Sequence, residues 1–284
     1  MPNFPIVDSH VHLWDPTHFR MMWTEGAPTL NKPYGVEEYA QHTEGIAIEA
    51  LVYLEVDVAP HYSLLEVAWV AERAKEEPRL KAIVAHAPLE YGEQARAYLA
   101  ALVQISPLVR GIRRLVQQEP DKDFQLQPRF VLGMQLLAEF NLSCDLCIKH
   151  HQLPATIELV KRCPQTRFIL DHIGKPNIAS GELQPWREDI FALAKLPNVI
   201  CKVSGMVTEA DYAHWILDDL RPYFETVYEA FGEDRVAFGG DWPVCTLAAS
   251  YSRWVEALES LSASLSDSAK RKLWAENARA FYRL

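Results

Sequence analysis

The chain has 284 residues, of which 49% are hydrophobic and 23% are charged, and its formal net charge is −10. This acidic balance excludes a surface built to bind nucleic acid, and the composition carries no sign of disorder. The chain contains no secretory leader pattern, and none of its apolar runs reaches the ~18 residues of a membrane span. We therefore expect a cytoplasmic protein with no membrane or nucleic-acid partner.

Eight short apolar runs, rich in β-branched residues, predict eight strands. In chain order they are 4–12, 49–56, 81–88, 109–115, 142–148, 167–174, 199–206 and 235–243. Segments with helical spacing of apolar residues lie between most of them, at 63–77, 92–105, 128–140, 153–163, 186–196 and 222–232. Apolar strands separated by helices are typical of a parallel sheet buried on both faces. Eight such units without a long linker predict an α/β fold, a single (β/α)8 TIM barrel domain over residues 1–284.

Two segments depart from this alternation of strands and helices. Residues 13–45 are rich in Trp, Met, Pro and Gly, and in a barrel they would lie over the mouth, where long loops are usually functional. Residues 266–284 predict a closing helix with Ser266 or Asp267 as its N-cap. The five cysteines include a CxxC pair at 144 and 147, but this pair lies in a buried-strand pattern. We interpret the cysteines as free thiols in a reducing compartment.

Most of the predicted strands end in polar side chains, and in a barrel these ends share one mouth. His10 and His12 end the first strand, and their spacing of two places both on the same face. The later strand ends carry Glu55, Arg113, His150, His151, Asp171, His172, Lys202 and Asp241. Each residue alone also has a structural interpretation, such as an ion pair between Glu55 and Arg113. Buried charges are costly unless paired, so the joint occurrence predicts an active site.

Four motifs, VDSHVHLW, LDHIGKP, KVSGM and FGGDWP, occur in an order and spacing that resemble the amidohydrolase superfamily. More narrowly, they resemble its lactonase branch, the amidohydrolase 2 group. That branch includes the sugar-acid lactonases for L-fucono- and L-rhamnonolactones and 2-pyrone-4,6-dicarboxylate lactonase. The similarity covers residues 6–243. The resemblance implies a distorted (β/α)8 barrel, in agreement with the strand count, and it implies hydrolysis of a cyclic ester.

Lactone hydrolysis requires a base for the attacking water, a donor for the developing oxyanion and an acid for the leaving alkoxide. We predict that Asp241 serves as both base and acid. His10, His12 and His172 would stabilise the oxyanion, either directly or by holding a divalent ion. The product would be an aldonic acid.

The need for a metal ion is open at this point. His10, His12, His172 and Asp241 would be good ligands for Zn²⁺, and the resemblance implies that the HxH pair and the last aspartate are usual ligands in the superfamily. For the lactonase branch the resemblance implies a dispensable ion. The fourth strand offers Arg113 and no bridging lysine, so we expect no binuclear centre. We favour a site that requires no metal, with one zinc ion as the alternative.

The substrate-binding candidates are Arg113, Glu55, His151, Lys202, Trp14 and Trp23. The planar fork of Arg113 suits a carboxylate or vicinal hydroxyls, and the aromatic rings suit the apolar face of a sugar. His150 is an alternative to His151. The mixture of charges favours a neutral sugar (aldono-) lactone over the dianion of a 2-pyrone-type dicarboxylate lactonase.

Two other functions remain as alternatives. One is a zinc-dependent decarboxylase or hydratase of the same superfamily, which would lose all activity without its ion. The other is a barrel that only binds a small ligand, which the presence of all four candidate catalytic groups disfavours. The oligomeric state is open, a homo-oligomer included.

Overall fold

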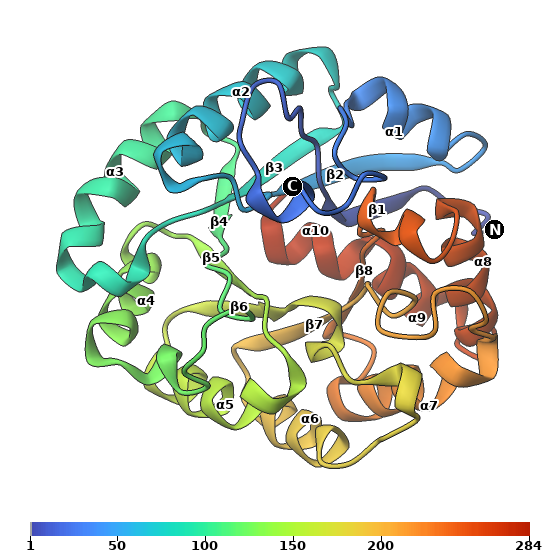
Figure 1. Ribbon diagram of the computed structural model, residues 1–284. Coiled ribbons are helices and arrows are strands. Elements are labelled where there is room, and N and C mark those ends of the chain that lie inside the picture. Colours follow the sequence, from blue (N-terminus) through green and yellow to red (C-terminus); the bar gives the residue numbers. More distant parts are fainter. Residues whose placement is uncertain (1) are drawn as a thin grey trace.

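Eight parallel strands surround a central axis and are themselves surrounded by helices in the computed structural model, which describes residues 2–284 (Figure 1). The strands are β1 Ile6–Val11, β2 Ile48–Leu54, β3 Leu80–Ala85, β4 Val109–Ile112, β5 Ser143–Leu146, β6 Arg167–Leu170, β7 Val199–Val203 and β8 Val236–Phe238. They pair in chain order from β1 to β8, each parallel to the next. The predicted (β/α)8 barrel is confirmed, with all eight strands at the expected places.

The barrel closes between the chain just after β8 and the end of β1. Val11 and Trp242 form a parallel bridge. The N–H of His12 donates to the carbonyl of Trp242 at 2.8 Å, and the N–H of Asp241 donates to the carbonyl of His10 at 2.8 Å. Closure therefore joins the very residues that carry the polar side chains of the first and last strands.

The helices are α1 Val36–His42, α2 Ser63–Glu76, α3 Ala95–Ile105, α4 Pro128–Glu139, α5 Leu153–Arg162, α6 Trp186–Ala194, α7 Leu217–Phe231, α8 Tyr251–Leu261, α9 Asp267–Arg271 and α10 Asn277–Tyr282. The six predicted between strands are present. The start predicted for the last of them, 222, is wrong, because α7 begins at Leu217 and accommodates Pro222 in its second turn. Neither α1 nor α8 was predicted. Of the two, α1 has only seven residues, and such short helices depend on tertiary packing more than on propensity.

The closing segment is interrupted rather than continuous. Ser266 caps α9 by accepting the N–H of Ala269 at 3.2 Å, as one of the two predicted caps. A π-helical turn, Lys272–Glu276, then leads into α10. Figure 1 shows α10 crossing the barrel axis behind the strands, where it covers the end opposite the strands' carboxyl ends.

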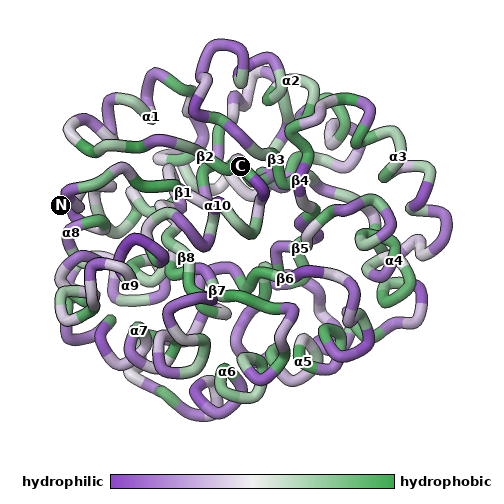
Figure 2. Tube along the Cα trace, turned by 180° about the vertical axis from the view of Figure 1, so that it is seen from behind, coloured by the Kyte–Doolittle hydropathy of each residue, from purple (hydrophilic) through white to green (hydrophobic). Residues whose placement is uncertain are grey.

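Hydrophobic residues gather along the strands and on the inward sides of the helices, whereas the outer turns are mostly hydrophilic (Figure 2). All five cysteines are buried and free, as predicted. Within residues 2–284, no helix combines the length and the apolar character that crossing a bilayer requires.

The carboxylate of Asp8 links the first strand to the last through hydrogen bonds. Its carboxylate is fully buried and accepts four hydrogen bonds, from the N–H groups of His10 (3.1 Å) and Gly240 (2.7 Å) and from the hydroxyls of Tyr39 (3.0 Å) and Tyr251 (2.8 Å). Burial raises the pKa of Asp8, and the four donors partly oppose that rise. A Cβ at Gly240 would lie 2.4 Å from the Asp8 carboxylate, so this close approach requires glycine.

Replacing Tyr251 by phenylalanine is expected to lower the free energy of unfolding by about 1–2 kcal/mol, because a buried carboxylate loses a donor. Urea unfolding at pH 7 measures the change. Tyr91→Phe is the matched control: Tyr91 is 55% exposed, and its replacement is expected to change the free energy by less than about 0.5 kcal/mol. Equal effects of the two variants would contradict the inference that the hydrogen bond between Asp8 and Tyr251 stabilises the fold.

Candidate active site

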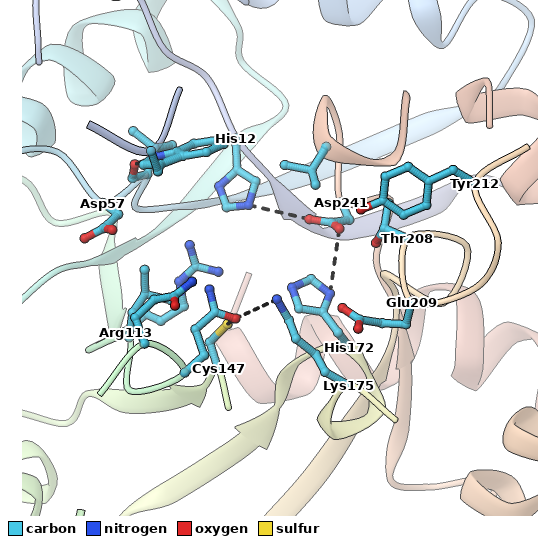
Figure 3. Close-up of a pocket in the computed structure, with 16 residues that line it drawn as sticks. His12, Asp57, Arg113, Cys147, His172, Lys175, Thr208, Glu209, Tyr212 and Asp241 are labelled. Carbon is cyan, nitrogen blue, oxygen red and sulfur yellow. Dashed lines mark hydrogen bonds and ion pairs between the residues drawn. The ribbon is translucent and has the colours of Figure 1, made fainter. Parts of the chain in front are cut away.

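A cavity of about 370 Å³ opens at the carboxyl ends of the strands. Its wall is formed by His12, Trp23, Val56, Asp57, Arg113, Leu115, Gln117, Gln118, Cys147, His172, Lys175, Thr208, Glu209, Tyr212, Asp241 and Val244. These residues follow seven of the eight strands, so the cavity is a product of the whole barrel. Figure 3 shows His12, Asp241 and His172 side by side on this wall.

Asp241 lies at the centre of the four predicted catalytic residues. Its Oδ1 is 3.6 Å from Nε2 of His12 and 3.6 Å from Nε2 of His10, and its Oδ2 is 3.9 Å from Nδ1 of His172. The Nε2 atoms of His10 and His12 are 3.2 Å apart. The structure thus brings the four predicted residues together, although His10 is fully buried below the wall and only the other three face the cavity.

Two of these residues adopt the left-handed backbone conformation. The φ angles are +51° at His172 and +54° at Asp241, immediately after β6 and β8. For residues other than glycine such angles cost of order 1–3 kcal/mol and concentrate at functional sites. The turn at His172 also needs Gly205, because a Cβ there would lie 2.5 Å from the imidazole Nδ1. The strained backbone turns both side chains toward one point.

The hydrogen bond of His12 to a carbonyl indicates which of its ring nitrogens carries the proton, whereas the contact of His172 with a hydroxyl does not. Nδ1 of His12 lies 2.9 Å from the carbonyl of Leu54, which can only accept, so His12 carries its proton there and leaves a lone pair on Nε2. Ser204 Oγ accepts the backbone N–H of His172 at 3.3 Å and lies 3.0 Å from its Nδ1. A hydroxyl can both donate and accept, so this contact is compatible with a proton on either ring nitrogen of His172.

Burial keeps two of the imidazoles neutral. It lowers the pKa of His10 and of His172 well below the usual range, and the cation of Lys202 acts in the same direction on His10. A neutral imidazole can donate through one nitrogen and accept or ligate through the other.

Arg113 and Glu55, both predicted to bind substrate, form a buried ion pair. Nε of Arg113 lies 2.6 Å from Oε1 of Glu55, and the second carboxylate oxygen accepts the N–H of Asp57 at 2.7 Å. Burial opposes the charge on Arg113, but the groups around it that favour the charge, with Glu55 the strongest, together outweigh burial and raise the pKa of the guanidinium. Arg113 reaches the cavity wall, whereas Glu55 is turned away from the cavity.

Of the other four residues predicted to bind substrate, one lies on the cavity wall and three lie outside it. Trp23 lies on the cavity wall and donates its indole N–H to the carbonyl of Val56 at 2.7 Å. Trp14 is buried behind it, with its own N–H directed to the carbonyls of Leu30 and Lys32. His151 is exposed in the turn His150–Gln152, and Lys202 is fully buried beneath His10. Neither His151 nor Lys202 nor Trp14 lines the cavity.

Several wall residues were not predicted from the sequence. Lys175 lies at the cavity (Figure 3) and donates to Oε1 of Gln117, another residue of the wall, at 2.7 Å. Glu209 lies beside His172 on the wall (Figure 3), and burial raises its pKa to about 6 while Lys175 opposes the rise. Lys175 belongs to the LDHIGKP motif, so its signal was visible. Gln117 and Glu209 lie in irregular connections, where no periodicity marks a residue as facing the mouth.

One group of side chains has the arrangement of a metal site. Nε2 of His10, Nε2 of His12 and Oδ1 of Asp241 are 3.2–3.6 Å apart. Ligand atoms around a tetrahedral zinc ion, with bonds of ~2.1 Å, lie about 3.4 Å apart. A second candidate group contains His10, His172 and Asp171, but Asp171 is 2.9 Å from the ammonium of Lys202. The first group therefore fits a single divalent ion better.

Comparisons with known proteins identify relatives over nearly the full length of the chain. The "Amidohydrolase" family model (Amidohydro_2) matches residues 7–284. An L-fucono-1,5-lactonase from Burkholderia multivorans is 30% identical, covering 98% of this chain and 96% of its own length. An L-rhamnono-gamma-lactonase from Scheffersomyces stipitis is 26% identical, with 98% of each chain covered.

A solved structure of an amidohydrolase from Burkholderia multivorans with bound zinc has a TM-score of 0.89 at 29% identity. The match covers 99% of this chain and 100% of that one. That structure holds a zinc ion. In this chain the His10, His12 and Asp241 group could hold one ion, which is the alternative left open by the sequence. Because the family model spans nearly the whole length, the chain belongs to the amidohydrolase family.

Proposed function

We propose that the protein hydrolyses a sugar lactone to the corresponding aldonic acid. The observation that carries the proposal is the carboxylate of Asp241 on the cavity wall, within 3.6 Å of His12 and 3.9 Å of His172. A carboxylate beside a neutral N–H donor, in a cavity of about 370 Å³, matches the needs of ester hydrolysis on a small ring. The lactonase names of two relatives support the substrate class.

Asp241 carries the proton through the reaction. It accepts a proton from water as the water oxygen bonds to the carbonyl carbon of the lactone. When the tetrahedral intermediate collapses, the bond between that carbon and the ring oxygen breaks. Asp241 then returns its proton to the ring oxygen, so the products are one hydroxyl and one carboxylic acid.

His172 stabilises the oxyanion. We assign its ring hydrogen to Nε2, with the Ser204 hydroxyl donating to Nδ1, and Figure 3 shows the ring beside the cavity between Asp241 and Lys175. An N–H aimed at the developing charge is worth roughly 3–4 kcal/mol in the transition state. We assign this donation to His172 rather than to all three histidines, because the free nitrogen of His12 has a lone pair and His10 does not reach the wall.

The residues present fit a single divalent ion held by His10, His12 and Asp241, as the spacing of their ligand atoms indicates. When bound, such an ion supplies Lewis-acid polarisation of the carbonyl and lowers the pKa of a bound water.

The remaining wall favours a neutral, hydroxyl-rich substrate. The two cations on the wall are already balanced, Arg113 by Glu55 and Lys175 by the nearby Glu209, so little positive charge is free for a dianion. Uncharged hydrogen-bonding groups, Gln117, Gln118, Thr208 and Tyr212, surround the same space. Trp23 provides a ring for the apolar face of a sugar.

A pH-indicator assay of aldono-1,4- and aldono-1,5-lactones, each with and without a chelator, tests the proposal. We expect acid release from at least one sugar lactone and none from 2-pyrone-4,6-dicarboxylate. Acid release from the dicarboxylate alone would contradict the substrate class. Absence of all lactonase activity together with chelator-sensitive release of CO₂ from an aromatic acid would favour the decarboxylase alternative.

Glu209 is expected to make product release depend on pH. Its pKa of about 6 means that the cavity gains a negative charge as the pH rises through 6, and this charge repels the aldonate product. The inhibition constant of added aldonate should therefore rise about fivefold between pH 5 and 7.5. Glu209→Gln should remove this dependence, and Glu182→Gln, at an exposed acid away from the cavity wall, should retain it. An unchanged pH dependence in Glu209→Gln would contradict the role.

A further inference from the structure

Lys202 of β7 lies directly beneath the candidate metal site and is fully buried. Its ammonium nitrogen is 2.5 Å from Oδ2 of Asp145, 2.9 Å from Oδ1 of Asp171 and 3.3 Å from Nδ1 of His10. An ammonium has three hydrogens and no lone pair, so it can donate to these neighbours but cannot accept a hydrogen from Nδ1 of His10. Lys202 is thus a positive charge fixed against one nitrogen of His10.

The C-terminal helix holds this lysine in place. Tyr282 of α10 donates its hydroxyl to the same oxygen of Asp145 at 2.5 Å, and the ammonium lies 5.4 Å from the centre of the Tyr282 ring. Both side chains are fully buried, as is Asp145 to within 1%. The position of the ammonium is therefore determined by β5, β6 and α10 together.

His10 and His12 differ in the way their outer nitrogen is supported. A metal-bound histidine almost always donates its other ring N–H to a carbonyl, a carboxylate or water. His12 does so, with Nδ1 2.9 Å from the carbonyl of Leu54. Nδ1 of His10 instead faces an ammonium, which cannot accept, and the nearest carboxylate oxygen, of Asp171 at 3.5 Å, is closer to Lys202.

The other side of His10 also faces a cation. Nη1 of Arg113 lies 3.3 Å from Nε2 of His10, the nitrogen that a metal ion would use. A divalent ion at this place would therefore sit near two fixed positive charges. The distances among the three ligand atoms suit an ion, but the groups around His10 oppose one.

We propose that Lys202 is a positioning residue that disfavours a metal ion on His10, so that the cluster of His10, His12 and Asp241 holds a divalent ion only weakly. Removing the ammonium would free Nδ1 of His10 to donate to Asp171 and would remove a positive charge from the site. This inference concerns metal affinity and is independent of the substrate.

The test is the zinc affinity of the purified, metal-stripped full-length protein, measured by competition with a chromophoric chelator. We expect Lys202→Met to bind zinc at least tenfold more tightly than the wild type, and Tyr282→Phe to shift the affinity in the same direction by a smaller factor. Lys272→Met is the matched control, because Lys272 also bridges two carboxylates, Glu233 and Asp234, at the surface. It should bind zinc as the wild type does.

Two double variants separate the effect of the ammonium from effects on folding and from zinc binding elsewhere. Lys202→Met leaves buried carboxylates without a cation, which lowers its stability. Lys202→Met/Asp145→Asn removes one of these negative charges. If the single variant folds poorly, the double variant should show the same gain in zinc affinity. Lys202→Met/His10→Ala should lose the gain. The proposal is overturned if neither Lys202 variant binds zinc more tightly than the wild type. It is equally overturned if the gain survives removal of His10, since zinc would then occupy the freed carboxylates.

Discussion

Replacing Asp241 by asparagine is expected to lower kcat for lactone hydrolysis about 10³-fold while the protein stays folded. Asparagine matches the shape of aspartate and tolerates the left-handed backbone at φ +54°, so the turn after β8 should survive. The amide cannot accept the proton of the attacking water, and it cannot return a proton to the ring oxygen. Steady-state kinetics, with circular dichroism to monitor folding, measure both consequences.

Asp57→Asn provides a matched control for this experiment. Asp57 lines the same cavity, is an aspartate with a positive φ of +52°, and lies on the far side from Asp241 (Figure 3). Its replacement should leave kcat within about threefold of the wild type. Near-wild-type turnover in Asp241→Asn would show that another group is the base.

Replacing His172 by asparagine is expected to reduce kcat by about 10²–10³-fold and to change KM by less than about threefold. The reason is that a donor aimed at the oxyanion acts in the transition state more than in the bound substrate. Asparagine again tolerates the backbone conformation, here at φ +51°. Initial rates over a range of lactone concentrations separate the two parameters.

Ser204→Ala extends the same prediction to the residue that orients the ring. Without the hydroxyl at 3.0 Å from Nδ1, the proton of His172 is no longer held at Nε2, and kcat should fall about tenfold. His151→Asn is the control, because His151 is exposed and lies outside the cavity wall. A change in KM alone for His172→Asn would assign this histidine to substrate binding.

Much of the fold was predictable because local patterns encode it. The alternation of buried strands and helical segments predicts the barrel, and the terminal polar residues predict which end is the mouth. The spacing of His10 and His12 places them on one strand face by the two-residue period of a β-strand. Barrel closure then brings Asp241 to them, since its backbone N–H pairs with the carbonyl of His10.

The partners and depth of the charged side chains were not predictable in the same way. The sequence indicates that Arg113, Lys202 and Glu55 lie near strand ends, but an ion pair such as Lys202 with Asp145 joins residues 57 positions apart. Which cation faces the cavity depends on how deep each strand sits in the barrel, and no local period encodes that. Lys202 was predicted to contact substrate, and the fold instead places it one layer below, against His10.

The sequence was therefore sufficient to predict the barrel, its mouth and the clustering of His10, His12, His172 and Asp241, because period and strand order are properties of short segments. The proton position on His12, the burial of Lys202 and Trp14, and the wall formed by Gln117 and Glu209 emerge only from the folded chain. Those features depend on atoms that long-range packing brings within 3–4 Å. The physical reason is that hydrogen bonds and ion pairs act over a few ångströms in space, irrespective of separation along the chain.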